Sequence, residues 1–208
     1  RRFLLGGHLM DLDWLWEITI RDMRLDLDRI SSRGKPFLVG LTDVRTGGPV
    51  YQATHAGNLE ETLKASSAIP LFYRGYPEID GRPMTDGGVS DAIPAAEAIR
   101  RGANRIMVIR SRPRDYVKAP GPLDFLLHWH LRRTPLLAEA FAARVGRYNS
   151  AQAFLRTPPE GVNIVEICPP REFRVSRFSR NLRVLRNGYE QGRALAVEAM
   201  VRWNRIAA

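Results

Sequence analysis

The chain has 208 residues, of which 44% are hydrophobic and 26% charged, so it can bury a core and wholesale disorder is excluded. Its 32 basic and 22 acidic side chains give a formal net charge of +10, which permits attraction to an anionic membrane surface or nucleic acid. The single cysteine, Cys168, excludes an internal disulfide, and no run of about 18 apolar residues predicts a transmembrane helix.

The first part of the chain predicts a helix followed by a hairpin. Apolar residues at helical spacing predict a helix over 9–23, and residues 25–32 predict a loop or a further turn of helix. Residues 37–44 read as a buried strand. A Thr-Gly-Gly-Pro turn joins that strand to residues 50–54, so the two segments predict a β-hairpin.

The middle of the chain predicts short elements separated by turns. A helix is expected from Asn58 as N-cap, with Glu61 completing a capping box, and it must stop near Pro70. Residues 71–85 read as short extended pieces with a tight Asp-Gly turn at 80–81.

A helix over 95–101 and a strand over 105–110 come next. Asp91 is the expected N-cap of this helix, and Pro94 suits its first turn. The proline-rich residues 112–122 are the clearest linker in the sequence.

The last part of the chain predicts mainly helix. A helical stretch over 123–154 is interrupted at Pro135, residues 162–168 predict a strand, and a final helix covers 182–206. Alternation of strands and helices favours an α/β layered fold with a mainly parallel sheet flanked by helices, followed by a helical C-terminal region.

The triplet Asp86, Gly87 and Gly88 follows an extended segment and directly precedes a helix. Two glycines leave room beside a carboxylate and let the backbone adopt positive φ. Taken alone, the triplet is typical of an ordinary turn closed by an Asx-type hydrogen bond.

The surroundings of this triplet point further. Residues 65–72 (Ala-Ser-Ser-Ala-Ile-Pro-Leu-Phe) and 85–94 (Thr-Asp-Gly-Gly-Val-Ser-Asp-Ala-Ile-Pro) together resemble the second half of the bacterial patatin-like phospholipases. Residues 6–15 and 164–170 resemble one bacterial branch of that family. The resemblance is strong over 1–112 and thinner through the C-terminal helices.

The resemblance implies a lipid acyl hydrolase with a Ser–Asp dyad and no catalytic histidine, acting on phospholipids or other acyl lipids. Asp86 matches the dyad aspartate that takes the serine proton, and Gly87 and Gly88 shape its turn. Ser66, Ser67 and Pro70 then neighbour the active site as pocket-lining residues. Such a dyad requires no metal or organic cofactor.

The sequence departs from the family pattern in one respect. It contains no Gly-x-Ser-x-Gly nucleophile motif, since residues 88–92 lack the second glycine and follow Asp86. In family order that motif precedes Arg1, and a chain that starts with arginine is expected to be a fragment of a longer protein. We therefore expect an N-terminally truncated fold, with residues 1–112 as the C-terminal part of the hydrolase domain. Residues 113–208 would form a mostly helical region with one strand, packed on the same domain, and this stretch alone is predicted to be inactive.

Two alternatives come from the charge. Arginines recur at every third position in one segment: Arg171, Arg174, Arg177, Arg180, Arg183 and Arg186. They fit a solvated surface, attraction to anionic lipid headgroups, or nucleic-acid binding, although no nucleic-acid motif accompanies them. A non-catalytic basic module that binds anionic membranes or a partner therefore stays open as an alternative function. We expect a cytoplasmic protein, with peripheral membrane contact as a variant of that expectation.

No metal site is expected from the four histidines. His128 and His130 are two residues apart and would point in different directions on a helix, whereas His8 and His55 are isolated.

Overall fold

The computed structural model describes residues 11–23, 25–70, 72–73, 75–121, 124–176 and 179–207. The first five residues of the 6–15 motif therefore lie outside the described part of the chain. By contacts the chain divides into two compact units. The first consists of Arg1–Ala92 and Ala119–Tyr148, and the second of Ile93–Lys118 and Asn149–Ala208.

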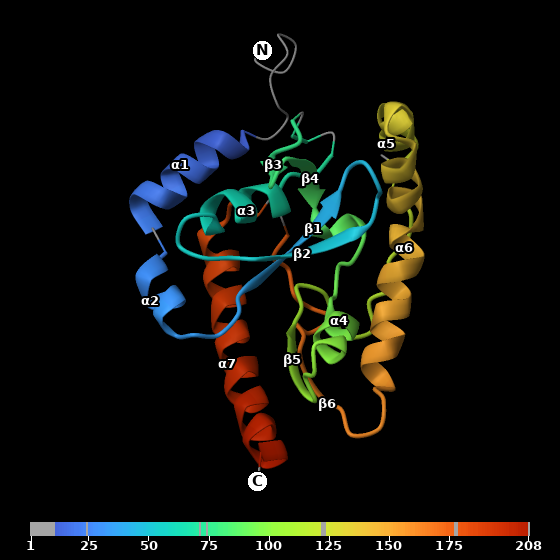
Figure 1. The fold of residues 1–208 in the computed structure, drawn as a ribbon. Helices are drawn as coiled ribbons and strands as arrows, with labels where there is room; N and C mark the ends of the chain where they lie inside the picture. The colour runs from blue at the N-terminus through green and yellow to red at the C-terminus, as the bar shows by residue number, and fades with distance from the viewer. Residues whose placement is uncertain are drawn as a thin grey trace. The chain divides into compact units, whose positions relative to one another are not determined.

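The first unit contains helices on a small sheet (Figure 1). Its elements are α1 (Leu12–Met23), α2 (Leu27–Ser32), β1 (Leu38–Asp43), β2 (Pro49–Ala53), α3 (Leu59–Ser66), β3 (Glu78–Ile79), β4 (Arg82–Asp86), the 3-10 turn η1 (Gly87–Val89), α5 (Asp124–His130), η2 (Leu131–Arg133) and the start of α6 (Pro135–Arg156). The second unit contains the end of α6 together with α4 (Ala95–Arg100), β5 (Arg105–Ile109), β6 (Asn163–Ile167) and α7 (Leu182–Ala207).

The four-stranded sheet of the first unit has the order β2-β1-β4-β3, and every neighbouring pair is antiparallel. In the second unit β5 and β6 form a separate parallel pair. The expected mixed α/β class is confirmed, but strand pairing among the described residues is mostly antiparallel, not mainly parallel. The reason is local, because β1 and β2, like β3 and β4, are joined by turns too short for a parallel crossover.

Turn chemistry explains both hairpins. Asp80 and Gly81 adopt φ of 50° and 69°, the left-handed backbone that a two-residue hairpin turn requires. Gly47 has φ of 66° in the turn between β1 and β2, and a Cβ there would lie 2.3 Å from the carbonyl oxygen of Leu136 on α6. A side chain at residue 47 is therefore excluded both by φ and by contact with α6.

Two buried clusters form the core of the first unit. One joins the end of β1 and η1 to α5, η2 and α6, through Val44, Val89, Leu127, Leu131, Leu137, Ala138, Ala140 and Phe141. The other lies between the sheet and α3, through Leu41, Ala65, Ile79 and Met84. The second cluster fixes α3 against β1 and β4, which is the region of the Asp-Gly-Gly triplet.

The expected N-cap position of Asn58 is confirmed without its capping bond, whereas the expectation for Asp91 is wrong. Asn58 stands at the N-cap of α3, but its side chain makes no cap bond and instead accepts a hydrogen bond from the His55 N–H at 2.8 Å. Pro94, not Asp91, is the N-cap residue of α4, and Asp91 accepts a hydrogen bond from the Tyr51 hydroxyl. In each case the side chain bonds to a group that precedes it in sequence.

The later elements agree with expectation in position. The predicted interruption at Pro135 is confirmed, because α6 begins there after η2. The strand predicted over 162–168 is β6, and the final helix is α7, which packs against β6. The predicted division of the chain at residue 112 stays a prediction.

Candidate functional site

Asp86 is the last residue of β4, and three hydrogen bonds define its position. Its N–H donates to the carbonyl oxygen of Ala68 at 3.2 Å, and its own carbonyl oxygen accepts from Thr42 Oγ1 at 2.8 Å. Its carboxylate oxygen Oδ1 accepts the Gly88 N–H at 2.7 Å. The carboxylate is half-buried and serves as the cap of η1. The expected Asx-type turn is therefore present.

Gly87 and Gly88 are required by close approach. A Cβ on Gly87 would lie 2.3 Å from the carbonyl oxygen of Gly40, in the middle of β1. A Cβ on Gly88 would lie 2.9 Å from Asp86 Oδ1. The first contact is with rigid backbone, so only glycine lets the turn after β4 lie flat against β1.

Ser66, Ser67 and Pro70 lie at the C-terminal end of α3 and just beyond it. Ser66 Oγ donates to the carbonyl oxygen of Gly40 at 2.7 Å, and Ser67 Oγ donates to that of Leu63 at 3.0 Å. Pro70 is fully buried. The structure therefore brings Ser66 and Gly87 to the same residue of β1, Gly40. Both serine hydroxyls are engaged by main-chain carbonyls, an arrangement that positions the helix end.

Behind the turn, sequence reasoning missed a pair of buried hydroxyls. Thr42 is fully buried on β1, and its Oγ1 lies 2.7 Å from Ser90 Oγ and accepts the Ser90 N–H at 3.2 Å. Thr85, its register partner on β4, donates from Oγ1 to the Ala68 carbonyl oxygen at 2.6 Å. The sequence feature that could have indicated this close packing is Gly40, because a glycine inside a strand often marks a place where another part of the backbone approaches closely.

The first helix is attached to this region through α3. Lys64 forms an ion pair with Asp13 of α1, and the Tyr73 hydroxyl donates to Asp13 at 3.3 Å. The hydrogen bond to Asp13 raises the pKa of Lys64, whereas burial raises the pKa of Tyr73. Lys64 therefore stays charged at neutral pH and holds α1 to α3.

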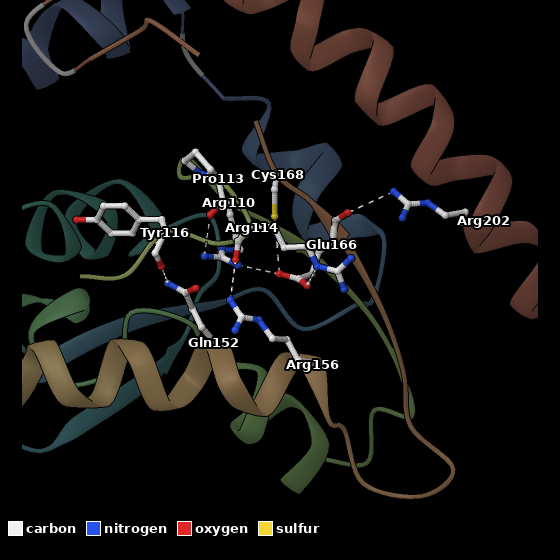
Figure 2. A network of polar contacts seen from close by, with 9 residues as sticks. All are labelled: Arg110, Pro113, Arg114, Tyr116, Gln152, Arg156, Glu166, Cys168 and Arg202. Carbon is white, nitrogen blue, oxygen red and sulfur yellow. Dashed lines mark hydrogen bonds and ion pairs between the residues drawn. The ribbon is translucent and has the colours of Figure 1, made fainter. Parts of the chain in front are cut away.

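A second polar site, in the second unit, was not anticipated from sequence. Figure 2 shows Arg110, Arg114 and Glu166 gathered at the ends of β5 and β6. Arg110 Nη1 donates to Glu166 Oε2 at 2.8 Å, and the two side chains are only 4% and 6% exposed. Arg114 Nε lies 3.1 Å from Glu166 Oε1 in an ion pair, although this oxygen accepts no hydrogen bond from the described residues.

The surrounding groups complete this network. Cys168 Sγ lies 3.7 Å from Glu166 Oε2, and Arg202 of α7 donates to the Glu166 carbonyl oxygen at 3.4 Å. Burial raises the pKa of the Cys168 thiol, and the charge of Glu166 raises it further. The thiol is therefore protonated at neutral pH and is a poor nucleophile.

Within the described ranges, no set of three or more histidine, cysteine, aspartate or glutamate side chains is arranged to hold a metal ion. No helix in the described part of the chain has both the length and the apolar composition to cross a bilayer. The His128 side chain lies outside the described part.

Comparison with known proteins identifies the class. Residues 12–99, which include Asp86 and its turn, match the model of the patatin-like phospholipase family. Residues 134–207 match the model of a domain of unknown function, DUF6363. The chain is a patatin-like protein, with its patatin-like domain at residues 12–99.

A relative in Escherichia coli (strain K12), the uncharacterized protein YjjU, is 35% identical over 197 residues. That match covers 92% of this chain and 55% of the relative, so the chain spans about half the length of YjjU.

Proposed function

We propose that this chain is part of a lipid acyl hydrolase in which Asp86 is the base of a Ser–Asp dyad. The nucleophilic serine belongs to a Gly-x-Ser-x-Gly segment that precedes Arg1 in the family order, so the 208 residues alone are inactive. The observation that carries this proposal is the Asp86 carboxylate, held at a strand end by the Gly88 N–H inside the segment that matches the family.

In this mechanism, the serine oxygen attacks the ester carbonyl while Asp86 accepts the serine proton. Collapse of the tetrahedral intermediate releases the alcohol, to which that proton passes, and leaves an acyl-serine that water hydrolyses. A carboxylate is a weaker base than the imidazole that other hydrolases use. Most of the rate enhancement must therefore come from backbone donors to the oxyanion, each worth ~3–4 kcal/mol. No metal or organic cofactor takes part in these steps.

The neighbouring residues have supporting roles in this proposal. Gly87 and Gly88 set the direction of the carboxylate, because any side chain at residue 87 would push the turn away from Gly40. Ser66, Ser67 and Pro70 line the acyl-lipid pocket. The hydrogen bond from Ser66 to Gly40 supports a positioning role for this serine, in preference to nucleophilic attack.

The test uses the full-length protein that contains the upstream segment. Asp86→Asn should abolish hydrolysis of a p-nitrophenyl ester or a phospholipid while the thermal unfolding temperature stays within a few degrees. Asp80→Asn is the matched control, since it removes the same charge at the exposed β3–β4 turn, where asparagine tolerates positive φ. Retained hydrolysis in Asp86→Asn would refute the assigned role.

A second measurement tests the inactivity of the isolated chain. An active-site fluorophosphonate should label the full-length protein stoichiometrically and leave the 208-residue chain unlabelled. Stoichiometric labelling of any serine in the short chain contradicts the proposal of an upstream nucleophile.

A specific observation favours membrane attachment as a second role. Large apolar side chains are exposed along α7: Leu182, Leu185, Tyr189, Val197, Met200 and Val201. Arg183, Arg186 and Arg193 are exposed on the same helix. A helix that mixes arginine with exposed apolar side chains suits the surface of an anionic bilayer. Co-sedimentation with phosphatidylglycerol vesicles that is lost at high salt would support this role, and no binding at low salt would exclude it.

A further inference from the structure

A cavity of about 220 Å³ lies in the second unit, beside β6 and α7. Its charged lining consists of Arg114, Glu166 and Arg202, and Cys168 also lines it. Its apolar lining consists of Ile164, Ile167, Pro169 and Leu195. The lining therefore combines charged and apolar side chains.

The charges of the lining favour an anion. Glu166 is the single carboxylate of the lining, and its Oε2 is already bonded to the buried Arg110 at 2.8 Å. Arg114 and Arg202 contribute two further positive charges at the cavity. Arg114 is 67% exposed and forms an ion pair with Glu166, whereas Arg202 donates a long hydrogen bond to a carbonyl oxygen; among the described residues neither guanidinium group has a further side-chain partner. Both guanidinium groups therefore keep donors that a bound carboxylate can use.

The size of the cavity and its apolar lining residues restrict the rest of the ligand. Cavities that enclose drug-sized ligands measure roughly 300–1,000 Å³, so 220 Å³ suits a smaller molecule. Ile164, Ile167 and Leu195 offer hydrocarbon contact and no hydrogen bonds to a tail. The neutral thiol of Cys168 adds no negative charge that would repel an anion.

We propose that this cavity binds a short-chain fatty carboxylate, with its head drawn to Arg114 and Arg202 and its tail against Ile164, Ile167 and Leu195. The site is separate from the Asp86 turn, since every lining residue belongs to the second unit. The suggestion that this ligand is a product of the hydrolase, and the site a sensor of that product, rests on the proposed function. The binding itself does not.

The test is calorimetric titration of the 208-residue chain with sodium octanoate. Saturable binding is expected, about fourfold weaker for each methylene removed, which is 0.8 kcal/mol converted at 1.4 kcal/mol per tenfold. Octanol and methyl octanoate should bind at least tenfold more weakly because they carry no charge. Inorganic phosphate should also bind at least tenfold more weakly, since it has no hydrocarbon tail to contact the apolar lining residues.

Variants locate the ligand. Arg202→Gln and Arg114→Gln should each weaken octanoate binding at least tenfold, and thermal unfolding verifies that both variants are folded. Arg186→Gln is the matched control, because Arg186 is an exposed arginine of α7 outside the cavity lining. Asp86→Asn should leave octanoate binding unchanged.

Several outcomes would overturn the proposal: no saturable binding, equal binding of octanol or phosphate, or equal weakening by Arg186→Gln. Loss of octanoate binding in Asp86→Asn would show that octanoate binds in the first unit. That result would refute this proposal without contradicting the proposed hydrolase function. Conversely, an inactive full-length protein whose 208-residue chain still binds octanoate through Arg202 would refute the hydrolase alone.

Discussion

The Asp86 turn in the first unit and the Glu166 network in the second hold their polar groups by different means. In the first unit, Thr42, Thr85 and Ser66 donate hydroxyl hydrogen bonds to main-chain carbonyls next to the Asp86 turn. In the Glu166 network, the central contact is a buried ion pair between Arg110 and Glu166. Neutral hydroxyl bonds cost little to desolvate, whereas a buried charge is tolerated only while its partner is present.

This difference predicts how each unit responds to substitution. The first unit should be sensitive to shape, because its strands and turn approach so closely that Gly87 has no room for a side chain. The second unit should be sensitive to charge. A site that must place one carboxylate accurately is better served by the first arrangement, and a site that must attract an anion by the second.

The largest effect is expected from breaking the buried pair. Glu166→Gln leaves Arg110 buried without its counter-charge and should lower the free energy of unfolding by about 3 kcal/mol or more. Urea unfolding followed by circular dichroism measures this change. The double variant Glu166→Leu/Arg110→Met should recover most of the loss, because two apolar side chains carry no unpaired charge. A double variant no more stable than Glu166→Gln would show that the charge is not the cause.

A smaller effect is expected from shape alone at the turn. Gly87→Ala should lower the free energy of unfolding by about 1–3 kcal/mol, because the new Cβ would lie 2.3 Å from the Gly40 carbonyl oxygen. Gly146→Ala is the matched control in α6, where a Cβ meets nothing within 4 Å, and it should stabilise by about 0.5–1 kcal/mol. Equal effects of the two substitutions would exclude close approach as the reason for Gly87.

The sequence anticipates the first unit better than the second for a physical reason. Asp86, Gly87 and Gly88 are contiguous, and the turn that they form is governed by local backbone geometry and a hydrogen bond spanning two residues. The hairpins are local in the same way. The alternation of strands and helices nevertheless favours a mainly parallel sheet, whereas the two hairpins are antiparallel. The prediction of Asp91 as an N-cap residue is wrong because its hydrogen-bond partner, Tyr51, lies 40 residues earlier on β2.

The second unit depends on contacts between distant segments. Arg110 and Glu166 are 56 residues apart, and Arg202 reaches them from the final helix. In a chain with 32 basic residues, no sequence pattern distinguishes the arginine that is buried from those that are solvated. Spacing along the sequence identifies a helix or a strand, whereas the pairing of two buried charges is a property of the folded structure.

The smallest effect is expected from the ion pairs of Glu97, whose arginine partners are more exposed than Arg110. Arg100 and Arg101 bond to the Glu97 carboxylate on α4, and their hydrogen bonds lower its pKa from 4.5 to about 2. Since the pKa is lower in the folded state, this contribution is complete above pH 4.5 and is lost as the pH falls toward 2. Glu97→Gln should therefore flatten the pH dependence of unfolding between pH 4.5 and 2, with little change at pH 7 beyond the loss of the pair itself. The effect should shrink in 1 M salt, which screens a pair whose arginines are 69% and 41% exposed, whereas the Arg110–Glu166 pair should respond little to salt. An unchanged slope in Glu97→Gln, or a salt effect of equal size in Glu166→Gln, would contradict this assignment of exposed and buried pairs.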